Sequence, residues 1–229
     1  MIKRPNLIKQ NNDIKTVQDE EINIESKEYN DLIRIYEIAM NQVASEINLV
    51  KEKLNKLYGY SIIDKITARV KSKKSIINKM KKKNIKYTYT SLIDNINDIA
   101  GVRITCPVQD DIFFVKQIIE MIPNLKIIKE KDYINNPKKS GYSAYHIIVE
   151  TPVTINGETV VMKVEIQIRT IAMDFWAEME HDIRYKSKNN MSLFDSKKLT
   201  WYAKVLEKLQ GKIVKIYRKQ ETNNIFYKY

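Results

Sequence analysis

The sequence predicts an α/β (α+β) domain in which a mixed β-sheet is flanked by helices, with a long helix at each end of the chain. Three observations support this fold class. Apolar residues recur at helical spacing in residues 27–58 and 196–219. Between these segments, apolar and polar residues alternate with a period of two, which is typical of strands. Four of the five prolines lie in this central part, and none interrupts a long helical pattern.

The chain begins with a polar segment and a long amphipathic helix. Residues 1–26 show no clear periodicity, so we expect a loose arm. The apolar stripe of residues 27–58 predicts a helix that ends at Gly59. We place a single folded domain, including the last helix, at residues 27–219 and expect residues 220–229 to form a tail.

A basic segment follows the first helix. Arg69 and Lys71 alternate in an extended stretch, and Ser72 is suited to cap a short helix on which Ser75 and Lys79 lie along one side. Lysine-rich segments most often form solvated faces, so ligand binding is one of two interpretations of this pattern.

Residues 94–106 predict a turn that leads into a buried strand. Asp98 stands at the start of this strand, and Gly101 permits a close approach of another backbone. An amphipathic helix over residues 110–121 and a strand over residues 126–133 come next.

Residues 138–169 predict the β-hairpin around which the chain is organised. Asn156-Gly157 supplies the two positive-φ positions of a type I′ turn. With these two residues as the loop, His146 lies opposite Gln167. This register places five polar side chains on one face: Tyr142, His146, Glu165, Gln167 and Arg169. A bulge at the proline within the first strand would shift the outer pairing, and a solvated sheet face is the alternative interpretation.

Helical spacing returns in residues 170–186 and again in residues 196–219. The apolar stripe of the last helix, which includes Trp201, Leu209 and Ile213, has no evident partner within the chain. We therefore expect a homo-oligomer.

The composition indicates a folded protein that attracts polyanions. The 229 residues are 43% hydrophobic and 30% charged, and the formal net charge is +12. Nucleic acid, anionic lipid and nucleotide phosphates all suit such a charge, and its sign alone does not choose among them. The chain has no apolar run of membrane-spanning length and no signal peptide, and its single Cys106 fits a reducing compartment. We expect a cytoplasmic protein without a membrane partner.

Several common sites are absent from the sequence. The five glycines are too scattered for a P-loop or a GxGxxG turn, and one cysteine with two histidines cannot supply a typical zinc site. Nucleotide phosphates would then be held by basic side chains and a carboxylate-bound metal. Asp98 and Glu165 suit Mg²⁺ if their strands are neighbours, because Mg²⁺ prefers oxygen ligands on rigid elements; exposed strand acids are the alternative.

Four segments together resemble the synthetase domain of the RelA/SpoT family, and the layout resembles a stand-alone small alarmone synthetase. They are RVKSKKSIINKM at 69–80, DIAGVRI at 98–104, DYINNPKKSGYSAYH at 132–146 and VEIQIRTIAMDFWAEMEH at 164–181. The resemblance implies a nucleotidyltransferase-like fold and the transfer of pyrophosphate from ATP to the 3′-hydroxyl of GDP or GTP, which yields (p)ppGpp. It also implies Mg²⁺ as the cofactor and a homotetramer as the assembly.

The resemblance further implies a role for individual residues by position. The ATP-binding positions are matched by Arg69, Lys71, Ser75, Lys79, Arg103 and Lys131. Lys131 stands where related proteins often have arginine, and an ammonium cannot reproduce bidentate or stacked guanidinium contacts.

The catalytic and metal-binding positions are matched by Asp98 and Glu165, and Glu165 also corresponds to the residue that helps to deprotonate the 3′-hydroxyl. The acceptor-binding positions are matched by Lys138, Tyr142, His146, Gln167 and Asp174. Tyr142 corresponds to the tyrosine that stacks on guanine, and Asp174 sits where many relatives carry asparagine.

Two other functions stay open on the sequence alone. One is a nucleic-acid-binding module whose residues 69–83 track phosphates, and the other is a nucleotidyltransferase that transfers AMP to another acceptor. RNA binding is not predicted. Because the chain has two histidines and no room for a second domain, we expect synthesis without the Mn²⁺-dependent hydrolysis found in long members of the family.

Overall fold

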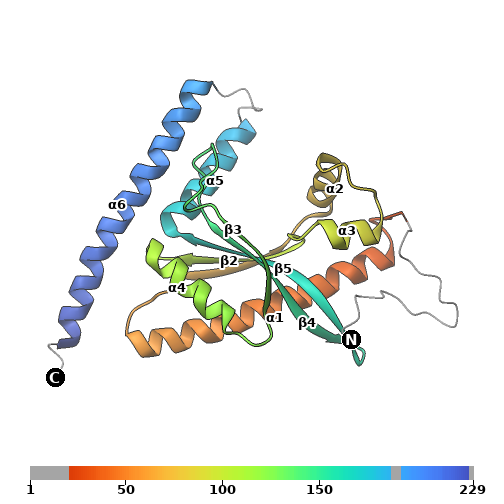
Figure 1. The fold of residues 1–229 in the computed structure, drawn as a ribbon, viewed down its shortest axis with the longest axis horizontal. Coiled ribbons are helices and arrows are strands. Elements are labelled where there is room, and N and C mark those ends of the chain that lie inside the picture. Colours follow the sequence, from red (N-terminus) through yellow and green to blue (C-terminus); the bar gives the residue numbers. More distant parts are fainter. Residues whose placement is uncertain (1–20, 187–191, 227–229) are drawn as a thin grey trace.

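The computed structural model describes residues 21–186 and 192–226, whose arrangement is shown in Figure 1. Within these residues, six helices surround a mixed five-stranded sheet, which confirms the predicted α/β class. The elements in chain order are α1 (Lys27–Tyr58), β1 (Lys65–Val70), α2 (Lys73–Lys82), α3 (Tyr89–Asn95), β2 (Ala100–Cys106), α4 (Gln109–Glu120), β3 (Lys126–Asp132), β4 (Tyr145–Ile155), β5 (Glu158–Thr170), α5 (Ile171–Lys186) and α6 (Leu193–Phe226).

The helix α1 occupies the predicted residues because both of its ends are capped. The Oγ of Ser26 accepts a hydrogen bond from the backbone N–H of Tyr29 at 3.1 Å. Gly59 takes the left-handed conformation (φ 70°) that ends a helix without strain. The apolar stripe, which includes Leu32 and Tyr36, is buried against the sheet. Because α1 and α4 lie along the same face of the sheet (Figure 1), the opposite face is left to form a site.

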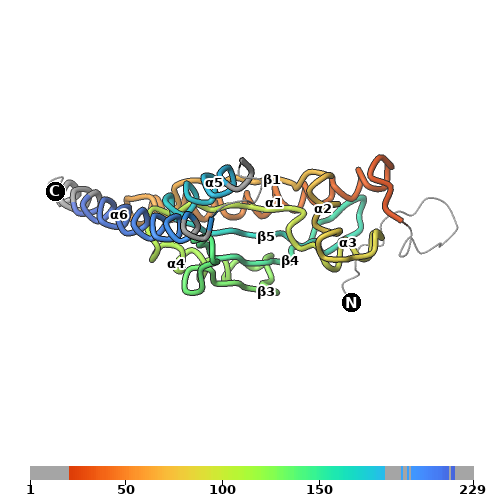
Figure 2. The backbone as a smooth tube through the Cα atoms, turned by 90° about the horizontal axis from the view of Figure 1, so that it is seen from above, coloured from red at the N-terminus to blue at the C-terminus, as the bar shows by residue number. Residues whose placement is uncertain are grey.

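The strand order β1-β2-β5-β4-β3 places the last strand of the sequence in the middle of the sheet. Figure 2 shows β5 and β4 near the centre, with β1 and β3 toward the two edges. The β2–β5 pair is parallel and the other three pairs are antiparallel. Ile104 of β2 and Ile166 of β5 are fully buried, so the parallel pair also forms the centre of the apolar core.

The β4–β5 hairpin has the predicted register. Asn156 (φ 51°) and Gly157 (φ 80°) form its loop, and His146 lies opposite Gln167. The pairing runs past Pro152 without a shift, so the bulge considered at that residue does not occur. A register shift occurs instead in the pairing of β3 with β4.

Two helices differ from the predicted outline. A short helix, α3, forms where none was expected, because the Oγ1 of Thr88 caps it by accepting the backbone N–H of Ser91 at 3.2 Å. The last helix, α6, extends to Phe226 and so continues into the residues expected to form a tail. Helical spacing alone underestimated its length because residues 220–224 are polar and interrupt the apolar stripe.

The N-terminal arm is described only from residue 21. Residues 1–20 lie outside the described residues. Ile22 pairs with the core segment through its backbone N–H, which donates to the carbonyl of Tyr87 at 2.8 Å, and its side chain packs against the core. The last residues of the expected arm are therefore attached to the domain. Among the described helices, none is both long and apolar enough to span a membrane.

We predict that the centre of the sheet is sensitive to loss of volume. Ile104→Ala removes a side chain with 0% exposure and should lower the free energy of unfolding by about 2–5 kcal/mol. Ile128→Ala is the matched control. Ile128 also lies on a strand, but 39% of its surface is exposed, so the substitution should lower the free energy of unfolding by less than about 1 kcal/mol. Urea titrations measure both values, and equal losses in the two variants would contradict this account of the core.

Candidate active site

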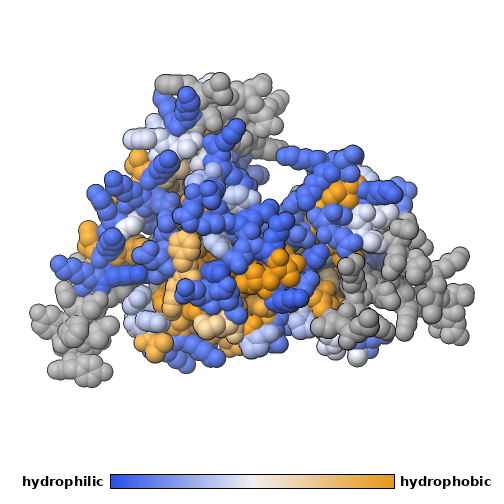
Figure 3. All heavy atoms as spheres, in the orientation of Figure 1, coloured by the Kyte–Doolittle hydropathy of each residue, from blue (hydrophilic) through white to orange (hydrophobic). Residues whose placement is uncertain are grey.

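The sheet face opposite α1 forms the floor of a cleft of about 1030 Å³. Residues of α2 and β1 line one side, and residues of α5 line the other. In the space-filling view, hydrophilic side chains surround the notch between α5 and α2 (Figure 3). The lining residues are Arg69, Lys79, Lys82, Asp98, Arg103, Lys131, Tyr133, Lys138, Lys139, Ser140, Tyr142, His146, Glu165, Gln167, Arg169, Ala177, Glu178, Glu180, His181 and Asp182.

The parallel pairing of β2 with β5 brings the two predicted carboxylates together. Gly101 of β2 lies opposite Glu165 of β5, and Asp98 precedes Gly101 by three residues. A Cβ atom on Gly101 would lie 3.7 Å from the backbone oxygen of Glu165, so the two strands are in ordinary van der Waals contact here. Both acids line the cleft, and the negative charge of Asp98 acts on the carboxyl of Glu165.

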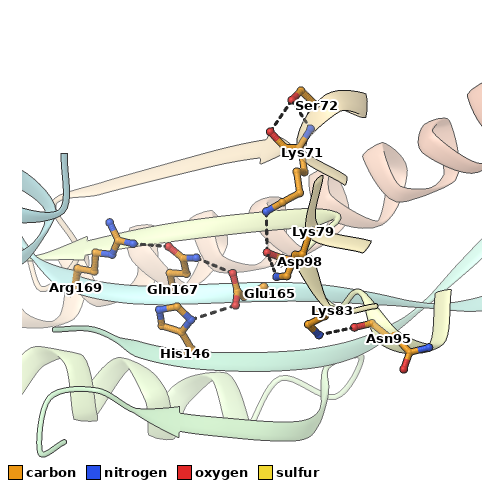
Figure 4. A network of polar contacts seen from close by, with 11 residues as sticks. Lys71, Ser72, Lys79, Lys83, Asn95, Asp98, His146, Glu165, Gln167 and Arg169 are labelled. Carbon is orange, nitrogen blue, oxygen red and sulfur yellow. Dashed lines mark hydrogen bonds and ion pairs between the residues drawn. The ribbon is translucent and has the colours of Figure 1, made fainter. Parts of the chain in front are cut away.

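Asp98 is held between two ammonium groups. Its Oδ2 accepts hydrogen bonds from Lys71 Nζ at 2.8 Å and from Lys79 Nζ at 2.6 Å (Figure 4). Burial alone would raise the pKa of Asp98, but these two partners outweigh it and keep the pKa below its ordinary value. Asp98 is therefore a carboxylate at neutral pH.

The second oxygen of Asp98 is available for a cation. Asp98 Oδ1 is buried and has no hydrogen-bond partner among the described residues. Those residues contain no cluster of three or more His, Cys, Asp or Glu side chains suited to a metal ion. Mg²⁺, however, commonly uses one or two carboxylates and fills its other positions with water and phosphate oxygens. The pair of Asp98 and Glu165 fits that requirement.

Glu165 belongs to a closed circuit of hydrogen bonds on the floor of the cleft. Its Oε1 lies 3.1 Å from His146 Nδ1, and its Oε2 accepts from Gln167 Nε2 at 2.6 Å. Gln167 Oε1 accepts from Arg169 at 2.6 Å, and the same guanidinium nitrogen donates to the hydroxyl of Tyr142 at 2.7 Å. The Tyr142 hydroxyl lies 2.7 Å from His146 Nε2, which closes the circuit. Figure 4 shows the part that runs from Arg169 through Gln167 and Glu165 to His146.

With a neutral His146, the donors and acceptors of this circuit have one consistent direction. Arg169 can only donate, so the Tyr142 oxygen accepts from it and its own proton points to His146 Nε2. His146 then carries its proton on Nδ1 and donates it to Glu165. Burial alone would raise the pKa of Glu165, but the hydrogen bonds from His146 and Gln167 keep it below its ordinary value. Glu165 is thus the ionised end point of the circuit.

The ring of Tyr142 lies among cations. Lys138 Nζ is 4.6 Å from the centre of this ring and 4.8 Å from the centre of the Tyr133 ring. The Arg169 guanidinium is 5.1 Å from the Tyr142 ring centre. These cation–π contacts hold an aromatic surface at the mouth of the cleft that a ligand base could share or take over.

The remaining predicted residues divide into those that line the cleft and those that do not. Arg69, Arg103 and Lys131 line it. Asp174 instead accepts from Arg103 at 3.0 Å and from Arg169 at 3.2 Å, behind the lining. Lys71 reaches the site through Asp98. Ser75 lies apart from the lining residues, on the exposed first turn of α2, where it accepts from Ser72 Oγ at 2.8 Å.

Among the lining residues to which the sequence assigns no role, Arg169 and Tyr133 contact the predicted site residues directly. Arg169 was placed on the polar face by the alternation of β5, and its 4% exposure with three side-chain partners marks it as the organiser of that face. Tyr133 precedes the turn at 138–142 and contacts His146 edge-on, with ring centres 5.2 Å apart. No period or spacing distinguishes Tyr133 from the other tyrosines of the sequence.

The chain resembles known proteins over most of its length. The family described as "Region found in RelA / SpoT proteins" matches residues 68–190. The GTP pyrophosphokinase YwaC of Bacillus subtilis (strain 168) is 37% identical over 179 residues, which cover 78% of this chain and 81% of that protein. The GTP pyrophosphokinase YjbM of the same organism is 38% identical over 159 residues, or 67% of this chain and 74% of that protein.

Solved structures agree with the sequence relatives. The small alarmone synthetase 1 from Bacillus subtilis bound to its product pppGpp matches with a TM-score of 0.75 and 30% identity, over 85% of this chain and 98% of that chain. A GTP pyrophosphokinase family protein from Streptococcus pneumoniae matches with a TM-score of 0.77 and 31% identity, over 86% and 97%. Both resemblances extend well beyond the cleft.

We predict that Glu165 makes the stability of the protein depend on pH. Its folded-state pKa lies below the ordinary value of 4.5, so its contribution is complete above that pH and is lost as the pH falls through the lowered pKa. Glu165→Gln should therefore be less stable than the unmodified protein at about pH 7, and the difference should narrow below about pH 4.5. Urea titrations across this range measure it. If the difference in unfolding free energy between the two proteins stays constant with pH, Glu165 is not held ionised by the hydrogen bonds of the circuit.

Proposed function

The chain belongs to the RelA/SpoT family, and from this premise we propose that it is a (p)ppGpp synthetase, a GTP pyrophosphokinase that transfers pyrophosphate from ATP to the 3′-hydroxyl of GDP or GTP. The observation that carries the proposal is the convergence of Asp98 and Glu165 inside a cleft lined by lysines and arginines. Such a cleft matches a reaction in which positioning and charge stabilisation do most of the work.

The reaction needs one bond to form and one to break. The 3′-oxygen of the acceptor attacks the β-phosphorus of ATP, the bond from that phosphorus to the oxygen bridging to the α-phosphate breaks, and AMP leaves. The hydroxyl proton must go to a base. Glu165 is suited to accept it, because its lowered pKa keeps it ionised at neutral pH and its position on β5 faces the cleft.

The basic residues on the β1 and α2 side form the proposed ATP site. Arg69 and Arg103 line the cleft as a pair of guanidinium groups suited to adenine and phosphate contacts. Lys79 of α2 adds an ammonium group for phosphate oxygens, and Lys131 of β3 adds another from the opposite edge of the sheet. Lys71 contributes through its ion pair with Asp98. Ser75 lies in the first turn of α2, where backbone amides of the helix N-terminus attract phosphate, and we propose that it contacts an ATP phosphate there.

The turn at 138–142 and the hairpin form the proposed acceptor site. Tyr142 presents its ring for guanine, and Lys138 can exchange its contact with that ring for an acceptor phosphate. His146 and Gln167 orient the carboxylate of Glu165 toward the acceptor. Asp174 is proposed to act on this site through Arg103 and Arg169, which it holds in place.

We propose Mg²⁺ as the cofactor, held by Asp98 and Glu165. The unpartnered Asp98 Oδ1 supports this, because a buried carboxylate oxygen without a donor suits a cation. When bound, the ion would neutralise phosphate charge that develops during transfer. Lys71 and Lys79 hold Asp98 ionised and oriented until then, and their ammonium groups lie where phosphate oxygens can be shared.

The assembly and location are further parts of the proposal. The face of α6 that includes Trp201, Leu209, Ile213 and Ile216 is at least half exposed, as expected for a surface that pairs within a homotetramer. Light scattering at micromolar concentration tests this, and a monomer would contradict it. We also propose a cytoplasmic location, which cell fractionation tests, and synthesis without hydrolysis, which purified protein incubated with ppGpp and Mn²⁺ tests.

We predict that only guanosine nucleotides acquire label in the decisive assay. Protein with β-labelled ATP, GDP and Mg²⁺ should yield labelled ppGpp, and chelation of the metal by EDTA should abolish the product until Mg²⁺ is restored in excess. Label from α-labelled ATP on another acceptor would indicate a nucleotidyltransferase that transfers AMP. Salt-sensitive oligonucleotide binding without turnover would indicate a nucleic-acid-binding module, which the +12 charge favours.

We predict that each carboxylate is required for turnover. Asp98→Asn and Glu165→Gln should each lower kcat by about 10³-fold, because the transition-state charge loses its ligand or the hydroxyl loses its base. Asp110→Asn on α4 and Glu150→Gln on β4 are matched controls outside the cleft lining and should keep kcat within about twofold. A kcat of either site variant within tenfold of the unmodified protein would refute these roles.

A further inference from the structure

We propose that Thr200 of α6 is a positioning residue for the acceptor nucleotide, because it holds the turn that carries Lys138 and Tyr142. Thr200 lies outside the cleft lining and bonds the backbone of the turn at Lys139. Its role would be to set the tilt of that turn relative to the hairpin. This inference rests on the proposed function, since it concerns the acceptor site of the same reaction.

The turn at 138–142 behaves as one unit because it is closed by its own backbone. The N–H of Lys138 donates to the carbonyl of Tyr142 at 3.0 Å, and the N–H of Gly141 donates to the carbonyl of Lys138 at 2.9 Å. Gly141 takes a φ of 80°, which an L side chain adopts only with strain. Lys138 and Tyr142 are therefore joined across the base of a tight turn, and a movement of its tip moves both.

The tip of this turn is seated on α6. Thr200 Oγ1 donates to the carbonyl of Lys139 at 3.1 Å. A Cβ atom on Gly141 would lie 3.1 Å from Ala203 Cβ and 3.2 Å from Thr200 Cα, so the glycine backbone packs directly on the helix. The hydrogen bond at Lys139 and the close contact at Gly141 thus fix the tip of the turn to one turn of α6.

The seating of the turn on α6 acts most directly on the acceptor side of the cleft. The Tyr142 hydroxyl bonds His146 and Arg169 at 2.7 Å, so a tilt of the turn breaks the circuit at that hydroxyl. Lys138 at the same time shifts relative to the Tyr133 ring, whose centre lies 4.8 Å from its Nζ. Arg69 and Lys79, in the proposed ATP site, belong to β1 and α2, which in the described part of the chain are elements separate from the turn and from α6. Loss of the Thr200 hydroxyl should therefore weaken the binding of the acceptor and spare that of ATP.

The test compares Thr200→Val, which keeps the shape and removes the hydroxyl, with Thr200→Ser, which keeps the hydroxyl. Thr200→Val should raise KM for GDP about fivefold, the loss of about 1 kcal/mol that one hydrogen bond contributes. KM for ATP should stay within about twofold. Thr200→Ser should restore KM for GDP to near the unmodified value. Lys212→Ala, at an exposed position further along α6, is the matched control.

Three results would overturn the proposal: an unchanged KM for GDP in Thr200→Val, an equal rise in KM for GDP and ATP, or no rescue by Thr200→Ser. Each presupposes turnover by the unmodified protein. Absence of labelled ppGpp from the unmodified protein would instead refute the proposed function, so the two failures are distinguishable. Circular dichroism of Thr200→Val identifies any general loss of helix, which would also count against a purely local role.

Discussion

The ionised carboxylate of Glu165 is the constraint on which the polar face of the sheet depends. It accepts from His146 and Gln167, and these two residues in turn determine how Tyr142 and Arg169 are oriented. A buried charge without donors is costly, whereas a fully satisfied network in a low dielectric is rigid. The hydrogen bonds of the circuit therefore fix the orientation of each of its side chains. Phosphoryl-type chemistry benefits from such preorganisation, because the site pays little reorganisation energy during transfer.

The cations of the cleft are partly balanced by the protein itself. Lys71 and Lys79 pair with Asp98, and Arg103 and Arg169 share Asp174. A polyanionic ligand must compete with these internal carboxylates for the same donors, so a single weak negative charge gains little by entering. A nucleotide bound with a divalent ion would offer Asp98 a cation in place of Lys71 and Lys79, whose ammonium groups could then contact phosphate. Such an exchange would favour binding of a metal–nucleotide complex over binding of free phosphate or of a ligand with a single negative charge.

Local physics made much of this structure predictable. Gly59 predicts the end of α1, and the Asn156-Gly157 turn predicts the register that places Glu165 and Gln167 on one face. The sequence predicts a metal site at Asp98 and Glu165 only if their strands are neighbours. No local signal specifies which distant strands pair, so the pairing of β2 with β5 is known only from the structure. Likewise, the contact between Gly141 and α6 depends on tertiary packing, which the local sequence does not specify. Residues defined by their spacing were found, and those defined by contacts between distant segments were not.

The strand order has a consequence for how the protein comes into being. β5 is the last strand to leave the ribosome, yet it occupies the middle of the sheet, between β2 and β4. Until it inserts, β2 has an open edge, and Asp98 and Glu165 have not met. Closing such non-local pairs is slow and leaves apolar edges transiently exposed. A nascent chain that stops before residue 158 therefore carries the basic residues of α2 and Asp98 without Glu165, so the two acids cannot come together until β5 has been made.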